Sequence, residues 1–237
     1  RKLNYALQVA LASPETKIIY PLPKEWKRLF EGFGLKVAHR RCSALFQIKI
    51  LFIWAFGILE LIRQFVAQIL TLGFLNARKS KNRASSYVYF DALQPTNINR
   101  PEYGPNFDII SWYTQWAGKK KYSKILRHDC VGHKGSFKHG EYTVSFQKNP
   151  VPPLEVPGKV FCFILWGLAS IMFSGFKIGC GCWWYGLLFY QTPNAKLVSL
   201  AKSSSIADQY FFSNSSFFRR QLWTYEAEKR GAQITLY

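Results

Sequence analysis

Two aspartates and one histidine are the candidates for acid–base chemistry in this sequence. Asp91 and Asp108 each lie at or near the end of a run that is typical of a β-strand, and His128 lies in a basic segment further on. A carboxylate or an imidazole in such a place can accept a proton from an attacking hydroxyl group. Trp112 follows Asp108 closely and would offer an aromatic surface beside it. The alternative is that both aspartates only cap turns.

Four further residues form a candidate anion site. Asn214 and Ser215 stand where a strand pattern gives way to a helical one, and Arg219 and Arg220 follow one turn later. Backbone N–H groups at a helix N-terminus attract anions, including phosphate. The alternative is ordinary helix capping by Asn214 or Ser215, combined with a basic helix face.

Neither a metal site nor a bound cofactor is expected from the motifs. The candidate ligands His128, Cys130, His133 and His139 lie within a short basic segment. Their spacing fits no standard zinc motif, and nearby lysines would repel a cation, so we expect a solvated loop there. Cys180 and Cys182 lack the two-residue spacer of thioredoxin-like redox sites. The sequence contains no dinucleotide-binding glycine motif, P-loop or nucleophile elbow.

The charge balance points to an anionic partner. The chain of 237 residues has 32 lysines and arginines against 13 aspartates and glutamates, a net charge of +19. Such a surface attracts nucleic acid or anionic lipid head groups. No nucleic-acid recognition module is present and the chain has long apolar stretches, so we expect an anionic membrane surface and no nucleic acid. Five cysteines without framework spacing indicate free thiols in a reducing compartment.

Two long apolar stretches are predicted to form helices, near residues 43–77 and 160–190. The charges of the first are Lys49, Glu60 and Arg63, which fall on one narrow stripe of a helix. The second begins with 17 uncharged residues, the short limit of a membrane span, and is broken by glycines around Trp183. We expect both helices to be membrane-associated, without a clean span in the first. The alternative is two core helices of a soluble domain.

The remaining pattern predicts alternating strands and helices. Strands are predicted at Thr16–Tyr20, Leu35–His39, Tyr87–Leu93, Phe107–Tyr113, Tyr142–Phe146, Gln209–Ser213 and Gln233–Tyr237. One helix is predicted to begin at Pro23 and end at Gly34, and another to begin after Asn214 or Ser215 and end at Gly231. Residues 117–139 are basic and glycine-rich, and a solvated loop is expected at residues 128–139. Strand–helix–strand units of this kind build a parallel sheet, so we expect an α/β fold.

Three stretches carry a resemblance to a known group of proteins. They are YVYFDAL at residues 87–93, FDIISWYTQW at 107–116 and SNSSFFRRQLWTYEAEKRG at 213–231. They resemble poorly characterised bacterial surface-polysaccharide biosynthesis proteins of the glycosyltransferase-like kind, which have two Rossmann-type domains (the GT-B fold). The resemblance extends over most of the chain from about Tyr20 onward. It includes no catalytic signature.

The resemblance implies that residues 1–237 are a single N-terminal, acceptor-side, Rossmann-like domain of a longer two-domain protein. In such enzymes the C-terminal domain holds most of the nucleotide-sugar donor. The implied function is transfer of a sugar from a nucleotide sugar, as substrate, to a glycan or lipid-linked acceptor. The implied place is the cytoplasmic face of the inner membrane, with peripheral or shallow insertion.

The main alternative function is that of a non-catalytic, membrane-associated partner in polysaccharide assembly or export. A weaker alternative is a nucleic-acid binder that acts through charge alone, which would show steeply salt-dependent binding.

Overall fold

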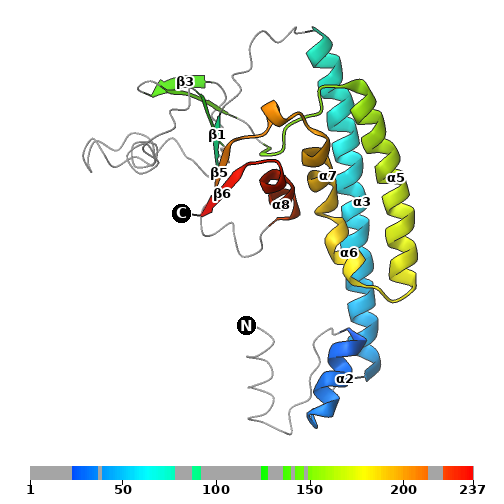
Figure 1. Ribbon diagram of the computed structural model, residues 1–237. Helices are drawn as coiled ribbons and strands as arrows, with labels where there is room; N and C mark the ends of the chain where they lie inside the picture. Colours follow the sequence, from blue (N-terminus) through cyan, green and yellow to red (C-terminus); the bar gives the residue numbers. More distant parts are fainter. Residues whose placement is uncertain are drawn as a thin grey trace, which may run out of the picture. The chain divides into compact units, whose positions relative to one another are not determined.

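The computed structural model describes residues 23–36, 39–77, 87–91, 124–127, 136–139, 142–146, 149–212 and 221–236. Figure 1 labels helices and strands of the chain. The chain divides into two compact units. The helical unit comprises Arg1–Arg63 and Gly167–Tyr190, and the sheet unit comprises Gln64–Trp166 and Gln191–Tyr237.

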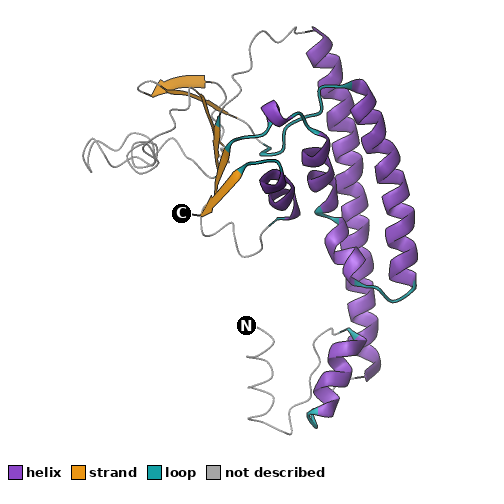
Figure 2. Ribbon diagram, in the orientation of Figure 1, coloured by secondary structure: helices purple, strands orange, loops and turns teal. Residues whose placement is uncertain are grey.

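The sheet unit contains a six-stranded sheet that is mostly parallel (Figure 2). Its strands are β1 (Val88–Phe90), β2 (Lys124–Arg127), β3 (Ser136–His139), β4 (Tyr142–Phe146), β5 (Gln209–Phe212) and β6 (Gln233–Leu236). The order across the sheet is β3-β4-β2-β1-β5-β6. All neighbouring strands from β4 to β6 pair in parallel, and β3 is antiparallel to β4 at the edge. The predicted α/β class and parallel pairing are therefore confirmed.

The two central strands, β1 and β5, are buried along their whole length. Burial on both faces is usual in parallel sheets, whose crossover connections cover both sides. Tyr89 and Tyr210 lie side by side on one face, with ring centroids 5.7 Å apart. Phe90 and Phe211 stack on the other face at 4.9 Å. Because successive side chains of a strand alternate between faces, this short strand pair contributes aromatic core to both.

Helix α8 (Leu222–Lys229) packs on the sheet through one tryptophan. The Trp223 ring is 1% exposed and lies edge-on to Tyr210, with centroids 5.0 Å apart, and 5.8 Å from Phe212. The chain runs from β5 through α8 to β6, which pairs in parallel with β5 (Figure 1). The strand–helix–strand unit predicted at the end of the sequence is therefore present.

The predicted start of α8 is wrong, whereas its predicted end is right. Gln221 holds the N-cap position, and the N–H group of Leu222 donates to the side-chain oxygen of Gln191 at 3.1 Å. That partner is distant in sequence, so residue spacing could not reveal it. Gly231, with φ of +91°, follows the helix as expected, since a left-handed backbone conformation favours glycine.

Within the sheet unit, polar contacts link the segments that come from three helices. Helix α3 (His39–Ala77) contributes Gln64, which donates to Asn194 in α7 (Thr192–Leu200) at 3.2 Å. Gln68 of α3 accepts the N–H of Leu154 at 2.8 Å. At the start of α5 (Pro157–Gly179), Lys159 donates to the last carbonyl of α7, that of Leu200. These buried polar groups are satisfied, as packing inside protein requires.

The helical unit contains α2 (Lys24–Gly32), the first part of α3, the end of α5, and α6 (Trp184–Phe189). The indole of Trp54 donates to the hydroxyl of Ser174 at 2.8 Å and so joins α3 to α5. Glycines allow α6 to lie directly on α3. A Cβ atom at Gly57 would stand 2.8 Å from the Phe189 ring, and one at Gly186 only 2.6 Å from Ile50. Small residues permit this close packing of helices.

Both predicted apolar helices are present, as α3 and as α5 followed by α6. The break between α5 and α6 falls at residues 180–183, where Gly181 has φ of +87°. The helix predicted at Pro23 is also present, with Pro23 as its N-cap and Gly34 (φ +77°) after it.

Two sequence expectations need correction. Leu35–His39 does not form a strand, because Leu35 and Lys36 are irregular and His39 already belongs to α3. Strand β3 forms at the end of residues 128–139, which we expected to be a loop, and β2 forms directly before that segment, where no strand was predicted. Their stability comes from pairing with β1 and β4, which local sequence cannot indicate. The strands expected at Thr16–Tyr20 and Phe107–Tyr113 lie outside the described residues.

Replacement of Trp223 by alanine tests this account of the sheet core. We expect a loss of about 3–5 kcal/mol in the free energy of unfolding, because a fully buried indole leaves a cavity. Tyr225→Ala on the same helix is the matched control, since Tyr225 is 46% exposed. Chemical denaturation followed by circular dichroism measures both. Equal losses in the two variants would contradict the packing described.

Candidate functional site at the carboxyl edge of the sheet

Asp91 lies at the carboxyl edge of the sheet, directly after β1. Its backbone N–H donates to the carbonyl of Phe211 in β5 at 2.8 Å, which holds it beside that neighbouring strand. Phe90, the residue before it, is in register with Arg127 of β2 and Phe211 of β5. The ends of β2, β1 and β5 therefore lie at the same level. The half-buried Asp91 stands on the middle strand of these three.

Asp91 is the member of the predicted site that falls within the described residues. His128 follows Arg127, the last residue of β2, in the sequence. Asn214 and Ser215 follow Phe212, the last residue of β5, after one intervening serine. His128, Asn214 and Ser215 lie outside the described part of the chain. The same holds for the remaining predicted site residues, Asp108, Trp112, Arg219 and Arg220.

The strand order reverses at the place where Asp91 lies. From β1 the chain continues to β2 and then to β4 on one side, and it later returns to the opposite side of β1 for β5 and β6. In open α/β sheets, connections that leave in opposite directions open a crevice outside the carboxyl ends of the strands, and ligands bind there. The position between β1 and β5 thus has the topology of a ligand site.

The amino edge of the same sheet is closed by backbone hydrogen bonds. The N–H of Asp208 donates to the carbonyl of Tyr87 at 3.0 Å, and the N–H of Gln233 donates to the carbonyl of Asp208 at 2.8 Å. Asp208 therefore takes part in the sheet's own bonding at this edge. The two aspartates, Asp91 and Asp208, mark opposite ends of neighbouring strands.

Tyr210 lies in the core below this edge and is not a proton carrier at neutral pH. Burial raises the pKa of Tyr210 to about 12, although the N–H of Ala207, which donates to its hydroxyl at 3.2 Å, opposes the shift. The phenol is neutral under ordinary conditions.

No metal-binding group occurs among the residues that the structure describes. In those ranges, no three His, Cys, Asp or Glu side chains come together. Of the ligand cluster considered in the sequence, only His139 is described, as the last residue of β3. Cys180 is an exposed free thiol and Cys182 a half-buried one, and both lie in the turn between α5 and α6.

The sequence predicted Asp91 by its place near the end of a strand, but not the reversal of strand order beside it. Reversal depends on which strands are neighbours, a property that no local pattern carries.

Comparison of the chain with protein-family models, curated proteins and solved structures finds no match.

The raised pKa of Tyr210 predicts alkaline destabilisation. The unfolded chain releases this proton near pH 10, the ordinary value, whereas the folded chain holds it to about pH 12. The contribution of Tyr210 to stability is therefore complete below about pH 10 and is lost as the pH rises to about 12. Urea unfolding midpoints measured across this range should fall less steeply in Tyr210→Phe than in the wild type. Tyr225→Phe is the exposed control, and an identical slope in Tyr210→Phe and the wild type would refute the assignment.

Proposed function

We propose that this chain is part of a membrane-associated glycosyltransferase that moves a sugar from a nucleotide-sugar donor to a glycan or lipid-linked acceptor in bacterial surface-polysaccharide biosynthesis. The observation that carries the proposal is the position of Asp91 at the reversal of strand order, on the edge where parallel sheets bind ligands. The resemblance of the sequence supplies the biological setting.

We further infer that the sheet is Rossmann-like. Counted along the chain, the parallel strands β1, β2, β4, β5 and β6 are arranged in the order third, second, first, fourth, fifth. This is the winding of the doubly wound sheets that bind dinucleotides, up to the fifth strand. The antiparallel β3 is an addition at the edge next to β4.

The chemistry of the proposed transfer is a direct displacement at the anomeric carbon. An acceptor hydroxyl oxygen forms the new bond to that carbon, and the bond to the nucleoside diphosphate breaks, so the diphosphate leaves with the electron pair. Asp91 accepts the hydroxyl proton, with Asp108 and His128 as the other candidates. Asn214, Ser215, Arg219 and Arg220 are the candidates that hold an anionic group, and Trp112 is the candidate sugar platform.

Chain connectivity supports the grouping of three of these residues. Consecutive Cα atoms are about 3.8 Å apart. His128 comes one residue after the end of β2, and Asn214 two residues after the end of β5, whose ends are level with that of β1. Along the sequence, His128 and Asn214 are therefore each no more than two residues from the end of a strand that neighbours β1.

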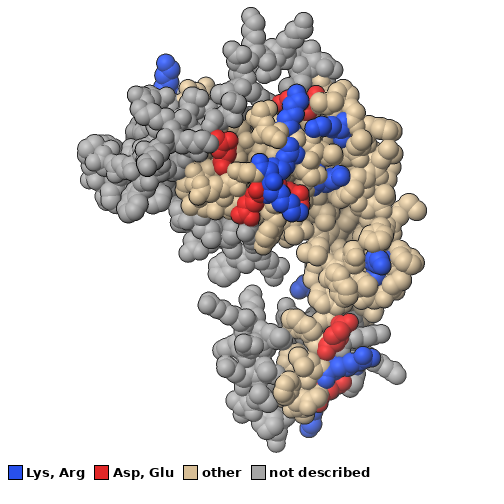
Figure 3. All heavy atoms as spheres, viewed as in Figure 1, with Lys and Arg blue, Asp and Glu red and all other residues tan. Residues whose placement is uncertain are grey.

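Two apolar helices support the membrane part of the proposal. The segments Ala44–Leu72 of α3 and Pro157–Gly179 of α5 are long and apolar enough to cross a bilayer, with mean hydropathies of 2.0 and 1.7. Core helices of soluble proteins are mostly buried. In each of these two segments, only 17% of an 18-residue apolar stretch is buried. Phe52 is 72% exposed and Met172 is 78% exposed. Figure 3 shows little charge along α5. Lipid is the solvent that suits such surfaces.

The connectivity of α5 and α6 favours shallow insertion. The chain leaves the sheet unit at Trp166 and returns to it at Gln191. Helix α6 has six residues and rises by about 9 Å, far less than the ~30 Å of a bilayer core. It is too short for a second crossing, so we propose that α5 and α6 enter and leave the membrane on the same side. That side is the cytoplasmic face of the inner membrane, in line with the free thiols.

Helix α3 also carries paired charge within its apolar segment. The guanidinium of Arg63 donates to both carboxylate oxygens of Glu60, at 2.7 and 2.6 Å, and Arg63 is largely exposed. Pairing lowers the cost of such charges near lipid, and their exposure suits the level of the head groups. The apolar part of α3 before Glu60 is thus the part that we propose to contact hydrocarbon.

Asp91→Asn tests the proposed reaction. We expect sugar transfer by the full-length protein in its native membranes to fall by roughly 100-fold or more, because the general base is lost while the shape of the side chain is kept. Asp208→Asn, at the opposite edge of the sheet, should retain transfer. The assay follows labelled sugar from a panel of nucleotide sugars into lipid or glycan.

The outcomes separate the two functions. Transfer that Asp91→Asn leaves intact removes Asp91 from the reaction. The absence of both transfer and nucleotide-sugar binding in a folded full-length protein would favour the non-catalytic assembly partner.

The shallow hairpin predicts the accessibility of Cys180. In a variant whose single cysteine is Cys180, a membrane-impermeant maleimide should label this exposed thiol in sealed vesicles from the side of the sheet unit, and not from the other side. A second variant with the single cysteine Ser204→Cys reports the side of the sheet unit, since Ser204 is exposed. Labelling of Cys180 from the side opposite to that of Ser204→Cys would show that α5 crosses the bilayer.

A further inference from the structure

A cavity of about 450 Å³ lies in the helical unit, between the start of α2, the first part of α3 and the turn that joins α5 to α6. Its volume falls within the range of small-molecule sites. No site was predicted here from the sequence. The cavity is formed by segments that are more than 100 residues apart in the chain, so only folding brings them together.

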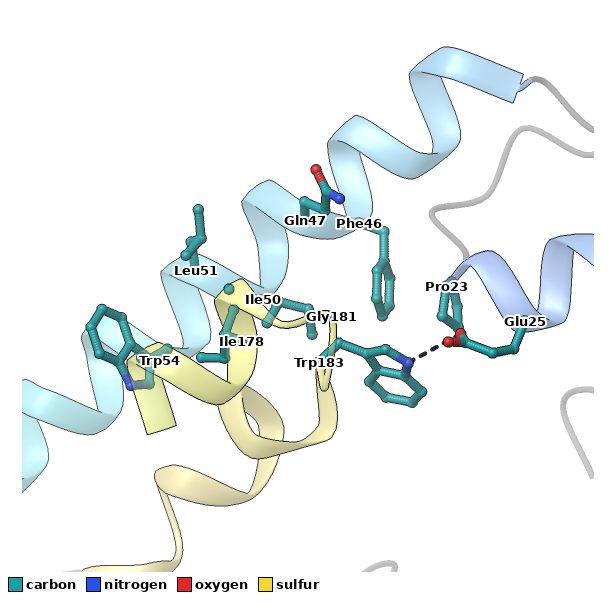
Figure 4. Close-up of a pocket in the computed structure, with 12 residues that line it drawn as sticks. Pro23, Glu25, Phe46, Gln47, Ile50, Leu51, Trp54, Ile178, Gly181 and Trp183 are labelled. Atoms are coloured by element: carbon teal, nitrogen blue, oxygen red, sulfur yellow. Dashed lines mark hydrogen bonds between the residues drawn. The ribbon is translucent and has the colours of Figure 1, made fainter. Parts of the chain in front are cut away.

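The body of the cavity is apolar. Ile50, Leu51 and Trp54 of α3 form one wall, and Ile178 of α5 faces them (Figure 4). Three glycines, at positions 175, 179 and 181, also line the space and leave it open. A Cβ atom at Gly179 would meet nothing within 4 Å, which shows that there is room beside α5.

One end of the cavity is polar and aromatic. The indole N–H of Trp183 donates to the carboxylate of Glu25 at 3.3 Å, and the Phe46 ring lies edge-on to Trp183 at 5.4 Å (Figure 4). Glu25 is the charged residue in the cavity lining. A carboxylate beside two aromatic rings attracts an organic ammonium group through charge and cation–π contacts. Figure 4 places Trp54 at the other end, away from Glu25.

The surroundings of the cavity identify the kind of ligand. Leu51 lines the cavity and is itself 50% exposed, and its neighbour Phe52 is 72% exposed. The cavity therefore borders the apolar surface that the proposed function places in lipid. A water-soluble ligand would need several convergent polar groups, whereas Gln47 is the one amide side chain in the cavity lining.

We propose that this cavity binds one acyl chain of a zwitterionic phospholipid, with the ammonium group of its head at Glu25. The apolar body takes the chain, and the glycines provide its path beside α5. The inference rests on the membrane association within the proposed function, and is independent of sugar transfer.

Photolabelling of the full chain in vesicles tests the proposal. The vesicles contain phosphatidylethanolamine and phosphatidylglycerol, with a trace of phosphatidylcholine that carries a diazirine on one acyl chain. Mass spectrometry then locates the label. We expect label on Ile50, which lines the cavity and is 2% exposed, and on the outward-facing Phe52 and Met172.

Two variants make the test specific. Gly179→Leu fills the cavity and should reduce label at Ile50 at least fivefold, with label at Phe52 unchanged. Gly158→Leu is the matched control, because it also adds a side chain to α5 in open space, but outside the cavity. The Glu25→Gln variant tests the head group. In the wild type, phosphatidylcholine should label Ile50 severalfold more strongly than phosphatidylglycerol that carries the same diazirine chain. In Glu25→Gln, the two lipids should label Ile50 equally.

Each outcome decides a separate point. The cavity proposal is overturned if Phe52 and Met172 are labelled but Ile50 is not. It is also overturned if Ile50 is labelled equally in Gly179→Leu and in the wild type. Either result leaves the membrane association standing. No label at any of the three residues overturns both. Equal label at Ile50 from the two lipids overturns the assignment of the head group to Glu25.

Discussion

The parallel pairing of β1 with β5 is the constraint on which the other features of the sheet unit depend. Two strands that run in the same direction cannot be joined by a tight turn, so the chain must cross over between them. Here the crossover into β5 includes α5, α6 and α7. The same pairing makes the N–H of Asp91 bond to the carbonyl of Phe211, which places a carboxylate at the reversal of strand order. Topology and candidate site thus have one origin.

The two faces of α3 differ in what their side chains meet. From Gln64 onward the buried amides of one face bond to Asn194 and to the backbone of Leu154, whereas Val66, Ile69 and Leu70 are each more than half exposed. Before Glu60, large apolar side chains such as Phe52 and Phe56 face outward. A single helix can serve both environments because its backbone hydrogen bonds are satisfied internally in either one.

The proposed reaction and the proposed lipid site draw on different parts of the chain. The first rests on the carboxyl edge of the sheet, and the second on the cavity beside Trp54 and Trp183. An enzyme that transfers sugar to a lipid-linked acceptor needs both an edge that receives polar substrates and a surface that accepts hydrocarbon. The large positive charge of the chain, +19, suits an anionic membrane surface, whereas Glu25 gives the cavity the opposite local preference.

The sequence by itself determined the elements that rest on local chemistry. The apolar composition of α3 and α5, the left-handed glycines Gly34 and Gly231, and the β-branched and aromatic runs of β1, β4, β5 and β6 were all legible in it. Only the tertiary structure decided the order of the strands, the existence of β2 and β3, the start of α8 at Leu222 and the cavity at Trp183. Each of these depends on partners far away in the chain, which residue spacing cannot specify.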